Sequence, residues 1–312
     1  MDGIILVHKP RDITSHDVVE RIRKILGLNK VGHFGTLDPL ATGLLMIAVG
    51  KATRLFPYFS KLDKAYTGCM KLGFATNTYD AEGKASTPVS EDYPSRKKIL
   101  KAMIQLTGDI DQVPPIFSAK KHRGRRLYSL ARENKSVVIK PSRVKIQTFE
   151  LLDYNPPLLD FLVVCSSGTY IRSLAHDLGQ ELGCGAHLSE LERIKMGQFT
   201  KEMSHRLDEI KTLAHGKKTE KFLLAMEGLL TEFPKIILTE PGKILAKNGN
   251  WISAENIQTI IPQDEPVTGF SNKERIYRLF STEGKLIALA KKSPMKPGLH
   301  PYLVIDTEVS EK

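Results

Sequence analysis

The chain has 312 residues, of which 46 are Lys or Arg and 35 are Asp or Glu, so it carries a net charge of +11. Hydrophobic residues make up 41% and aromatic residues 7%, which is enough for packed cores and too much for a disordered chain. No apolar stretch approaches the roughly 18 residues needed to cross a bilayer, and at roughly 150 residues per domain the length suggests about two domains.

The first residues and the cysteines indicate the cellular compartment. The short apolar run at residues 4–7 follows no basic segment, so it does not resemble a signal peptide. Cys69, Cys165 and Cys184 are few and show no CxxC spacing, which argues against a disulfide scaffold or a zinc site. We therefore expect a soluble cytoplasmic protein that binds no metal and no membrane.

The beginning of the chain predicts a strand, a helix and a loop. Residues 3–7 are apolar, and the Thr14–Asp17 segment has the pattern of a capping box. Apolar residues then recur at helical spacing as far as Leu26, and Gly27 is a suitable C-terminal stop. Residues 31–42 are rich in Gly, Thr, Asp and Pro and predict a loop, and an apolar run follows at residues 43–50.

The rest of the chain predicts further strands and helices before and after Pro234. Before it we expect strands at residues 66–74, 144–152 and 160–165, and helices at 95–106, 169–182, 207–214 and 220–230. After it the sequence contains short runs typical of β-strands, at residues 236–238, 276–280, 286–290 and 302–305. We therefore expect a domain at residues 1–234 and a small, mostly β domain at residues 235–312.

A strongly basic segment lies at residues 120–145. Ten Lys and Arg residues there are opposed by one acidic residue, Glu133. Most Lys-rich runs are solvated faces, but the arginine content and the hinge at Gly124 favour a polyanionic partner such as nucleic acid.

The predicted loop contains the sequence Gly-Thr-Leu-Asp-Pro at residues 35–39. Pro39 biases Asp38 towards an extended conformation, and a carboxylate on a rigid loop suits a nucleophile or an acid–base group. On spacing alone an ordinary turn is the better interpretation, because Asp-Pro is a common turn dipeptide.

Several motifs occur in the order typical of one enzyme family. They are Lys9-Pro10 with Thr14–Asp17, the Asp38 loop, Lys64-Ala65-Tyr66, residues 72–83 (with Asp80), residues 167–172 (Ser-Gly-Thr-Tyr-Ile-Arg) and residues 183–188. This set resembles the TruB family, whose bacterial members are tRNA pseudouridine-55 synthases. The resemblance is dense from Gly3 to about Phe199 and thin beyond it.

The resemblance implies a catalytic set of three residues. Asp38 would be the nucleophile, attacking the ribose at C1′ or the base at C6; an alternative path begins with abstraction of the ribose 2′ proton. Arg172 would hold the Asp38 carboxylate, because its planar fork fixes a carboxylate better than a lysine does. Tyr66 would stack on the target uracil and serve as a late proton shuttle.

The resemblance also implies how the RNA is bound. His33 would fill the space left by the flipped uridine, Leu191 would pack on the other side of the base, and Asp80 would hydrogen-bond a neighbouring base. Lys64 and the basic insert at about residues 113–145 would grip phosphates. The remaining substrate contacts that we expect are Tyr170, Arg123, Arg125 and Arg126.

The family implies an α+β pseudouridine synthase fold with a mixed, largely antiparallel sheet, followed by a small PUA-like β domain. We expect a monomer that acts on the T arm of tRNA without a cofactor, a metal or an obligate protein partner. Two departures from the family pattern stand out. Asp12 replaces a usual Gly, and Glu192-Arg193 replaces two basic residues, which would weaken a local RNA contact.

Two other functions fit the same residues. One is a synthase that depends on a guide RNA and works inside a complex, although the basic insert favours independent binding of tRNA. The other is a tRNA-folding protein with little catalysis, although the intact set of Asp38, Tyr66 and Arg172 argues against a purely non-catalytic role.

Overall fold

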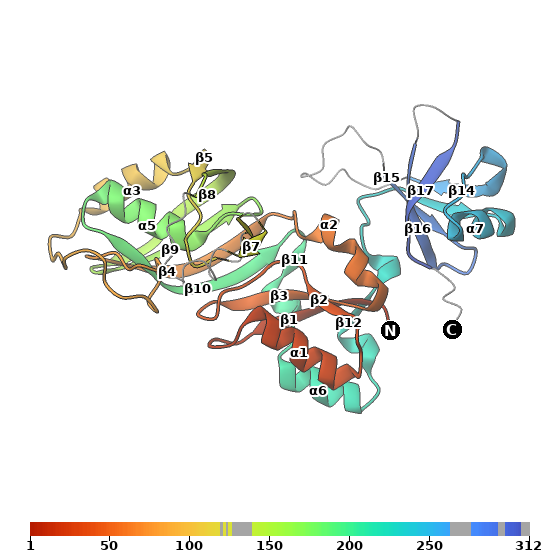
Figure 1. The fold of residues 1–312 in the computed structure, drawn as a ribbon, viewed down its shortest axis with the longest axis horizontal. Helices are drawn as coiled ribbons and strands as arrows, with labels where there is room; N and C mark the ends of the chain where they lie inside the picture. Colours follow the sequence, from red (N-terminus) through yellow and green to blue (C-terminus); the bar gives the residue numbers. More distant parts are fainter. Residues whose placement is uncertain (119–120, 123, 127–138, 263–275, 293–296, 307–312) are drawn as a thin grey trace.

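The computed structural model describes residues 1–118, 121–122, 124–126, 139–262, 276–292 and 297–306 (Figure 1). Its main feature is a ten-stranded sheet. In spatial order the strands are β12 (Leu223–Ala225), β1 (Gly3–Lys9), β3 (Thr42–Val49), β10 (Ala186–Met196), β4 (Lys64–Leu72), β9 (Leu158–Cys165), β8 (Ser142–Asn155) and β5 (Gly108–Gln112). β2 (Val31–His33) also pairs with β3, and β11 (Phe199–Thr200) with β10.

A second sheet follows near the end of the chain. In spatial order its five strands are β14 (Ile257–Ile261), β13 (Lys235–Leu238), β15 (Ile276–Phe280), β16 (Leu286–Lys292) and β17 (Leu299–Val304). A short hairpin in the basic insert pairs β6 (Lys121–His122) with β7 (Arg125–Arg126). Among the described strands of the large sheet only β3 and β10 pair in parallel, so the prediction of an α+β fold with a mixed, largely antiparallel sheet is confirmed.

Among the described residues the α-helices are α1 (Ser15–Leu26), α2 (Phe56–Phe59), α3 (Arg96–Gln105), α5 (Ile171–Leu182), α6 (Leu207–His215) and α7 (Glu240–Lys247). The predicted capping box is present: Thr14 Oγ1 accepts from the Asp17 amide, and the Asp17 carboxylate accepts from the Thr14 amide. Gly27 closes the helix at φ 64°, a left-handed conformation that suits glycine. Within the described ranges no helix is long and apolar enough to cross a membrane.

The central strands are buried on both faces, which explains their continuous apolar sequences. Ile5, Val7 and Ile47 face a core that also includes residues of α1, α3, α5 and α6. Ile4, Leu6 and Met46 face a second core that includes α2 and residues of β15 and β16. The small sheet therefore shares this second core with α2, and Phe233, which leads into β13, packs on Tyr58 of α2.

Three predictions about elements are wrong. Residues 220–230 form two 3-10 turns and β12 rather than a helix, because this segment pairs with β1 at the sheet edge. α5 begins at Ile171 rather than Thr169, whose hydroxyl donates to the Ser166 carbonyl outside the helix. The segment 31–42 contains β2 before its loop.

Several elements of the structure carried no signal that we recognised in the sequence. They are the long strand β10, the strands β5 and β14, and the helix α7. β10 matters most for the site, because it lies between β3 and β4 and joins the two halves of the sheet. Asp12, the departure from the family glycine, has φ 66° and so occupies a conformation that favours Gly but that Asp tolerates.

Candidate active site

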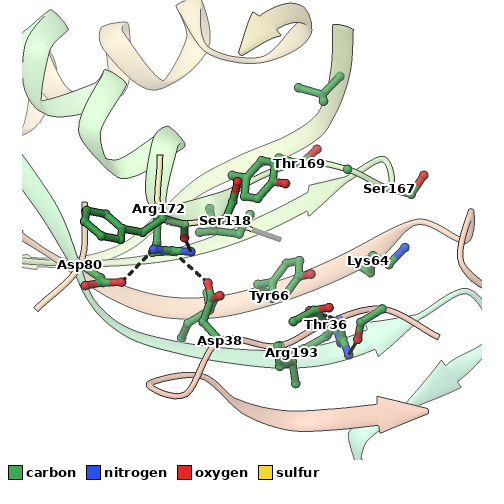
Figure 2. Close-up of a pocket in the computed structure, with 18 of the residues that line it drawn as sticks. Thr36, Asp38, Lys64, Tyr66, Asp80, Ser118, Ser167, Thr169, Arg172 and Arg193 are labelled. Atoms are coloured by element: carbon green, nitrogen blue, oxygen red, sulfur yellow. Dashed lines mark hydrogen bonds and ion pairs between the residues drawn. The ribbon is translucent and has the colours of Figure 1, made fainter. Parts of the chain in front are cut away.

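A cavity of about 980 Å³ lies over the middle of the large sheet, where β4 and β10 pair (Figure 2). The loop between β2 and β3 forms one side, and the start of α5 forms the other. Its lining includes seven of the predicted site residues: Asp38, Lys64, Tyr66, Asp80, Tyr170, Arg172 and Leu191. Its size falls within the range of about 300–1,000 Å³ that is usual for small-ligand sites, so it has room for an extruded nucleotide.

The loop that carries Asp38 is held from below by two side chains. Ser15 Oγ donates to the Leu37 carbonyl and accepts from the Leu37 amide, at 2.9 and 2.8 Å. Lys9 is fully buried, and its Nζ donates to the carbonyls of Pro39 and Ala41 at 3.2 and 2.7 Å. Burial lowers the pKa of Lys9 to about 8, although the nearby Asp38 carboxylate opposes this shift.

Arg193 holds the same loop from β10. Its guanidinium donates to the carbonyls of Leu44 and Gly35, at 2.7 and 3.1 Å, and its side chain is among the largest that are fully buried. Neither Arg193 nor Lys9 was predicted to take part in the site. Arg193 is therefore an internal support for the Asp38 loop, and the weakened RNA contact expected at Glu192-Arg193 stays a prediction.

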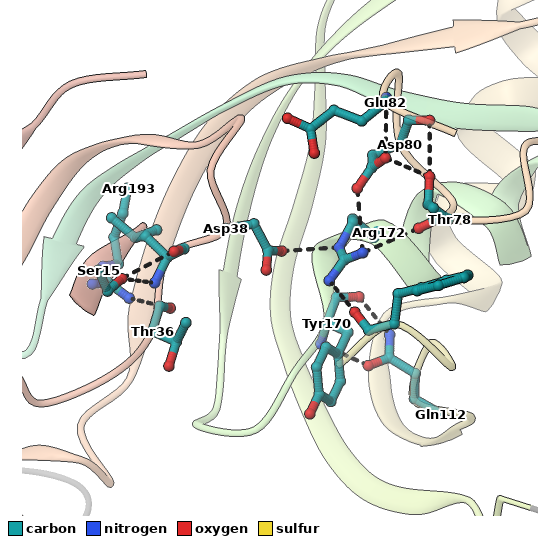
Figure 3. Close-up of polar contacts among 12 residues, drawn as sticks. Ser15, Thr36, Asp38, Thr78, Asp80, Glu82, Gln112, Tyr170, Arg172 and Arg193 are labelled. Atoms are coloured by element: carbon teal, nitrogen blue, oxygen red, sulfur yellow. Dashed lines mark hydrogen bonds and ion pairs between the residues drawn. The ribbon is translucent and has the colours of Figure 1, made fainter. Parts of the chain in front are cut away.

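The central feature of the cavity is an ion-pair network around Arg172 (Figure 3). Arg172 Nε lies 2.9 Å from Asp38 Oδ2, although its N–H does not point along the line between the two atoms. Nη1 lies 3.2 Å from Asp80 Oδ2 and also donates to the Thr78 carbonyl, and Nη2 donates to the Phe117 carbonyl at 3.0 Å. Arg172 and Asp80 are buried, whereas 35% of the Asp38 side chain is exposed. The exposed end of this network is thus the Asp38 carboxylate, which faces the cavity.

The Asp80 carboxylate is fixed by its own turn. Its Oδ1 accepts from Thr78 Oγ1 at 2.5 Å and from the Glu82 amide at 3.1 Å. Its remaining oxygen is the one beside Arg172. Both oxygens are therefore engaged inside the protein, and the predicted hydrogen bond to a neighbouring base stays a prediction.

Tyr170 immediately precedes α5 and is positioned through its backbone. The Gln112 side chain donates to the Tyr170 carbonyl at 3.0 Å and accepts from its amide at 2.8 Å. Gln112 is buried at the end of β5, so the edge of the sheet sets the start of the helix that carries Arg172. Burial raises the pKa of the Tyr170 phenol above its usual value of 10.

Tyr66 and Leu191 come from the paired strands β4 and β10 and are both about 7% exposed. Burial raises the pKa of Tyr66 above 10, so its phenol keeps its proton at neutral pH. Lys64 also lines the cavity, but its Nζ donates to the carbonyls of Ser60 and Leu62, at 2.9 and 2.6 Å. Burial lowers the pKa of Lys64 to about 8, and its contact with phosphate stays a prediction.

In the part of the chain that the structure describes, none of the other predicted binding residues is seen in this network. His33 ends β2 and is not among the described residues that line the cavity, and burial lowers its pKa below 6.5. Arg123 lies outside the described residues, as do residues 119–120 and 127–138 of the basic insert. The backbones of Arg125 and Arg126 form β7. Within the described ranges, no group of three His, Cys, Asp or Glu side chains has the arrangement of a metal site.

Sequence motifs alone could not identify Lys9, Arg193 and Gln112 as supports of the site. Each side chain binds backbone groups that are distant in the chain: the separations are 30 positions for Lys9, 58 for Gln112 and 158 for Arg193. Of the three, Lys9 alone gives a weak local signal, since it closely follows the apolar residues 4–7.

Comparison with known proteins agrees with this geometry. The family model for the N-terminal domain of TruB family pseudouridylate synthases matches residues 23–171, and the model for the tRNA pseudouridylate synthase B C-terminal domain matches residues 172–231. Both models therefore describe parts of the large sheet and its helices. The junction of the two models lies directly before Arg172, inside the site.

Curated relatives match over most of the chain. A tRNA pseudouridine synthase B from Dehalococcoides mccartyi is 42% identical over 82% of this chain and 86% of its own length. One from Solibacter usitatus is 39% identical over 98% of this chain and 100% of its own length.

Two solved structures share the fold. A chain of a Cbf5–Nop10–Gar1 complex has a TM-score of 0.72 and 27% identity, covering 98% of this chain and 85% of its own. A chain of an H/ACA RNP bound to a substrate RNA containing 2′-deoxyuridine has a TM-score of 0.71 and 26% identity, covering 97% and 85%. Fold, cavity and relatives together define a pseudouridylate synthase. The chain belongs to the TruB family.

Proposed function

We propose that the protein converts the uridine at position 55, in the T loop of tRNA, to pseudouridine. The relatives that match most of the chain are named tRNA pseudouridine synthase B, which supports tRNA as the substrate. The observation that carries the chemistry is the Asp38 carboxylate, which lies 2.9 Å from a buried guanidinium at an open cavity.

The reaction breaks the N1–C1′ bond, turns the uracil and forms a C5–C1′ bond, so the C5 proton is lost and N1 gains one. Nothing is oxidised, and the atoms balance without a co-reactant. Asp38 is placed to attack the ribose at C1′ or the base at C6, and the same carboxylate could remove the 2′ proton of the ribose. In each path Arg172 stabilises the ionised carboxylate and fixes its direction.

The uridine must leave the RNA loop to reach this carboxylate. Tyr66 and Leu191 come from neighbouring strands and offer an aromatic and an aliphatic surface for an extruded base. We propose that His33 fills the space left in the RNA, that Asp80 and Tyr170 contact substrate at the cavity wall, and that Lys64, Arg123, Arg125 and Arg126 bind phosphates. The cost of unstacking the base, a few kcal/mol, is offset by these contacts.

The proposal includes action by a single chain in the cytoplasm, without an obligate protein partner. Asp38, Tyr66 and Arg172 all come from this chain and meet in one cavity. Cys69, Cys165 and Cys184 are free thiols, which suits a reducing compartment. We also propose that residues 1–234 form the catalytic domain and residues 235–312 a small RNA-binding domain.

Release of tritium from C5 of uridine in a T-arm stem-loop tests the function, using purified protein and no guide RNA. We expect release to stop at one equivalent per RNA. Asp38→Asn should lower turnover by roughly a thousandfold or more while RNA affinity stays within a few fold, because the amide is a poor nucleophile of similar shape. Asp153→Asn, an exposed carboxylate on β8, is the matched control and should leave the rate unchanged.

Two outcomes would overturn the proposal. Appreciable turnover by Asp38→Asn would show that Asp38 is not the nucleophile. Absence of tritium release by the wild type, with tight RNA binding, would instead favour a guide-dependent synthase or an RNA-folding protein. The Cbf5 structures favour the first of these two alternatives, and adding a guide RNA would test it.

A further inference from the structure

We propose that Tyr79 and His176 form a stacked positioning pair that sets the contact between Asp80 and Arg172, and through it the direction of the Asp38 carboxylate. This inference rests on the proposed function, because it concerns how the same site is aligned. The two rings are nearly parallel, with centroids 3.9 Å apart and an interplanar angle of 15°.

The pair lies beside the ion-pair network because of the geometry of α5. Arg172 and His176 are four residues apart in this helix and so project from the same face on successive turns. On the opposing turn, Tyr79 and Asp80 are adjacent in the chain. The helix and the turn therefore meet at two points: Arg172 with Asp80, at 3.2 Å, and His176 with Tyr79.

The backbone of Tyr79 is strained in a way that needs such support. Its φ is 65°, in the left-handed region that is unfavourable for a bulky side chain. Its amide donates to the Thr76 carbonyl at 3.2 Å, and its carbonyl accepts from the Leu188 amide on β10 at 2.9 Å. Strain of this kind persists only where the surroundings fix it, and the stack on His176 holds the ring of Tyr79 in place.

The imidazole acts as a packing surface rather than as a charge. Burial lowers the pKa of His176 below 6.5, so the ring is neutral at neutral pH. Without the stack, the turn at residues 78–80 is free to relax towards a negative φ. Because Asp80 is the next residue in the chain, its carboxylate would then shift relative to Arg172, and the 3.2 Å contact between them would lengthen.

Four variants separate ring contact from backbone strain. His176→Ala removes one ring, whereas His176→Phe keeps an aromatic surface. Tyr79→Gly removes the other ring but suits the positive φ, so it relieves strain while it loses the stack. Tyr79→Phe keeps the ring and removes only the hydroxyl.

We expect His176→Ala and Tyr79→Gly to lower the single-turnover rate of tritium release by about tenfold, because misplacement of a reacting group by a fraction of an ångström is costly. The dissociation constant for the T-arm stem-loop should change less than about twofold. The two Phe variants should retain most of the wild-type rate. Gln180→Ala, an exposed position one turn further along α5, is the matched control and should match the wild type.

A second measurement does not depend on activity. The side-chain Nε–H resonance of Arg172, assigned with Arg172→Lys, should shift in His176→Ala and stay in place in Gln180→Ala. A wild-type rate and an unmoved resonance in His176→Ala would overturn the positioning role while leaving the proposed function intact. An inactive wild type would overturn the proposed function, and the resonance would still decide the positioning role.

Discussion

At the scale of single residues, Arg172 uses each nitrogen of its guanidinium differently. Nε faces Asp38, Nη1 faces Asp80 and the Thr78 carbonyl, and Nη2 donates to the Phe117 carbonyl. A planar group with five donors can serve these partners at once, whereas an ammonium is a single point charge. The side chain thus connects the Asp38 loop, the Asp80 turn and the segment after β5.

Arg172→Lys tests whether this geometry is needed. We expect the single-turnover rate to fall at least about tenfold, because one ammonium cannot hold both carboxylates in their observed directions. Arg96→Lys is the control, because it makes the same substitution at an exposed position in α3, outside the site. A near-normal rate in Arg172→Lys would show that charge alone is sufficient.

The sequence could identify Asp38, Tyr66 and Arg172 as members of one cavity only through the family motifs. Their order in the chain is preserved, but the contact between residues 38 and 172 depends on strand pairing far away. The buried cations Lys9 and Arg193 were missed for the same reason: what they bind is backbone carbonyl, which has no sequence signature.

At the scale of elements, the close approach of β3 and β10 holds the loop above them. Gly43 has φ 94°, and a Cβ atom there would lie 2.5 Å from the Arg193 carbonyl. A side chain would therefore push apart the one parallel strand pair of the large sheet. Glycine at this position lets Arg193 reach the Asp38 loop.

Gly43→Ala should destabilise the protein more than Gly27→Ala does. Gly27 also has a positive φ, but a Cβ there meets no atom within 4 Å, so its cost is the left-handed conformation alone, about 1–2 kcal/mol. For Gly43→Ala we expect a loss of about 3 kcal/mol or more in the free energy of unfolding, measured by urea denaturation. Equal losses in the two variants would show that the strands separate at little cost.

Local signals predicted the elements whose ends are set locally. The capping box at Thr14 and the glycine stops at Gly27 and Gly183 are examples, since each involves residues within a few positions. The segment 220–230 was predicted wrongly because its conformation depends on pairing with β1, more than 200 positions earlier. β10 was missed although it is long, because buried and exposed residues do not alternate regularly along it.

At the scale of the whole molecule, the excess positive charge and the ion-pair network of the cavity lie in different segments of the chain. The net charge of +11 is concentrated in the basic insert, whereas the described catalytic network contains two carboxylates around one guanidinium. We therefore propose that long-range attraction of RNA and local chemistry are carried by separate residues. Attraction of this kind depends on salt because each neutralised phosphate releases a counterion.

Replacing Arg123, Arg125 and Arg126 together by Gln should weaken RNA binding and flatten its dependence on salt. We expect the slope of log affinity against log salt to fall by about two units, since each phosphate contact contributes about 0.7 to 0.9. The measurement is the affinity for a T-arm stem-loop at salt concentrations from about 50 to about 200 mM, over which phosphate-dependent binding changes strongly. An unchanged slope would show that these side chains do not contact phosphate.

The position of β10 between β3 and β4 also determines when the protein can become active during its synthesis. β3 and β4 follow each other in the chain, but they are separated in the sheet by a strand that ends at Met196 (Figure 1). Until the ribosome has released that strand, the half that carries Asp38 and the half that carries Arg172 have no shared sheet. We therefore expect the nascent chain to stay inactive until about two thirds of it has been made, and incomplete products not to modify RNA.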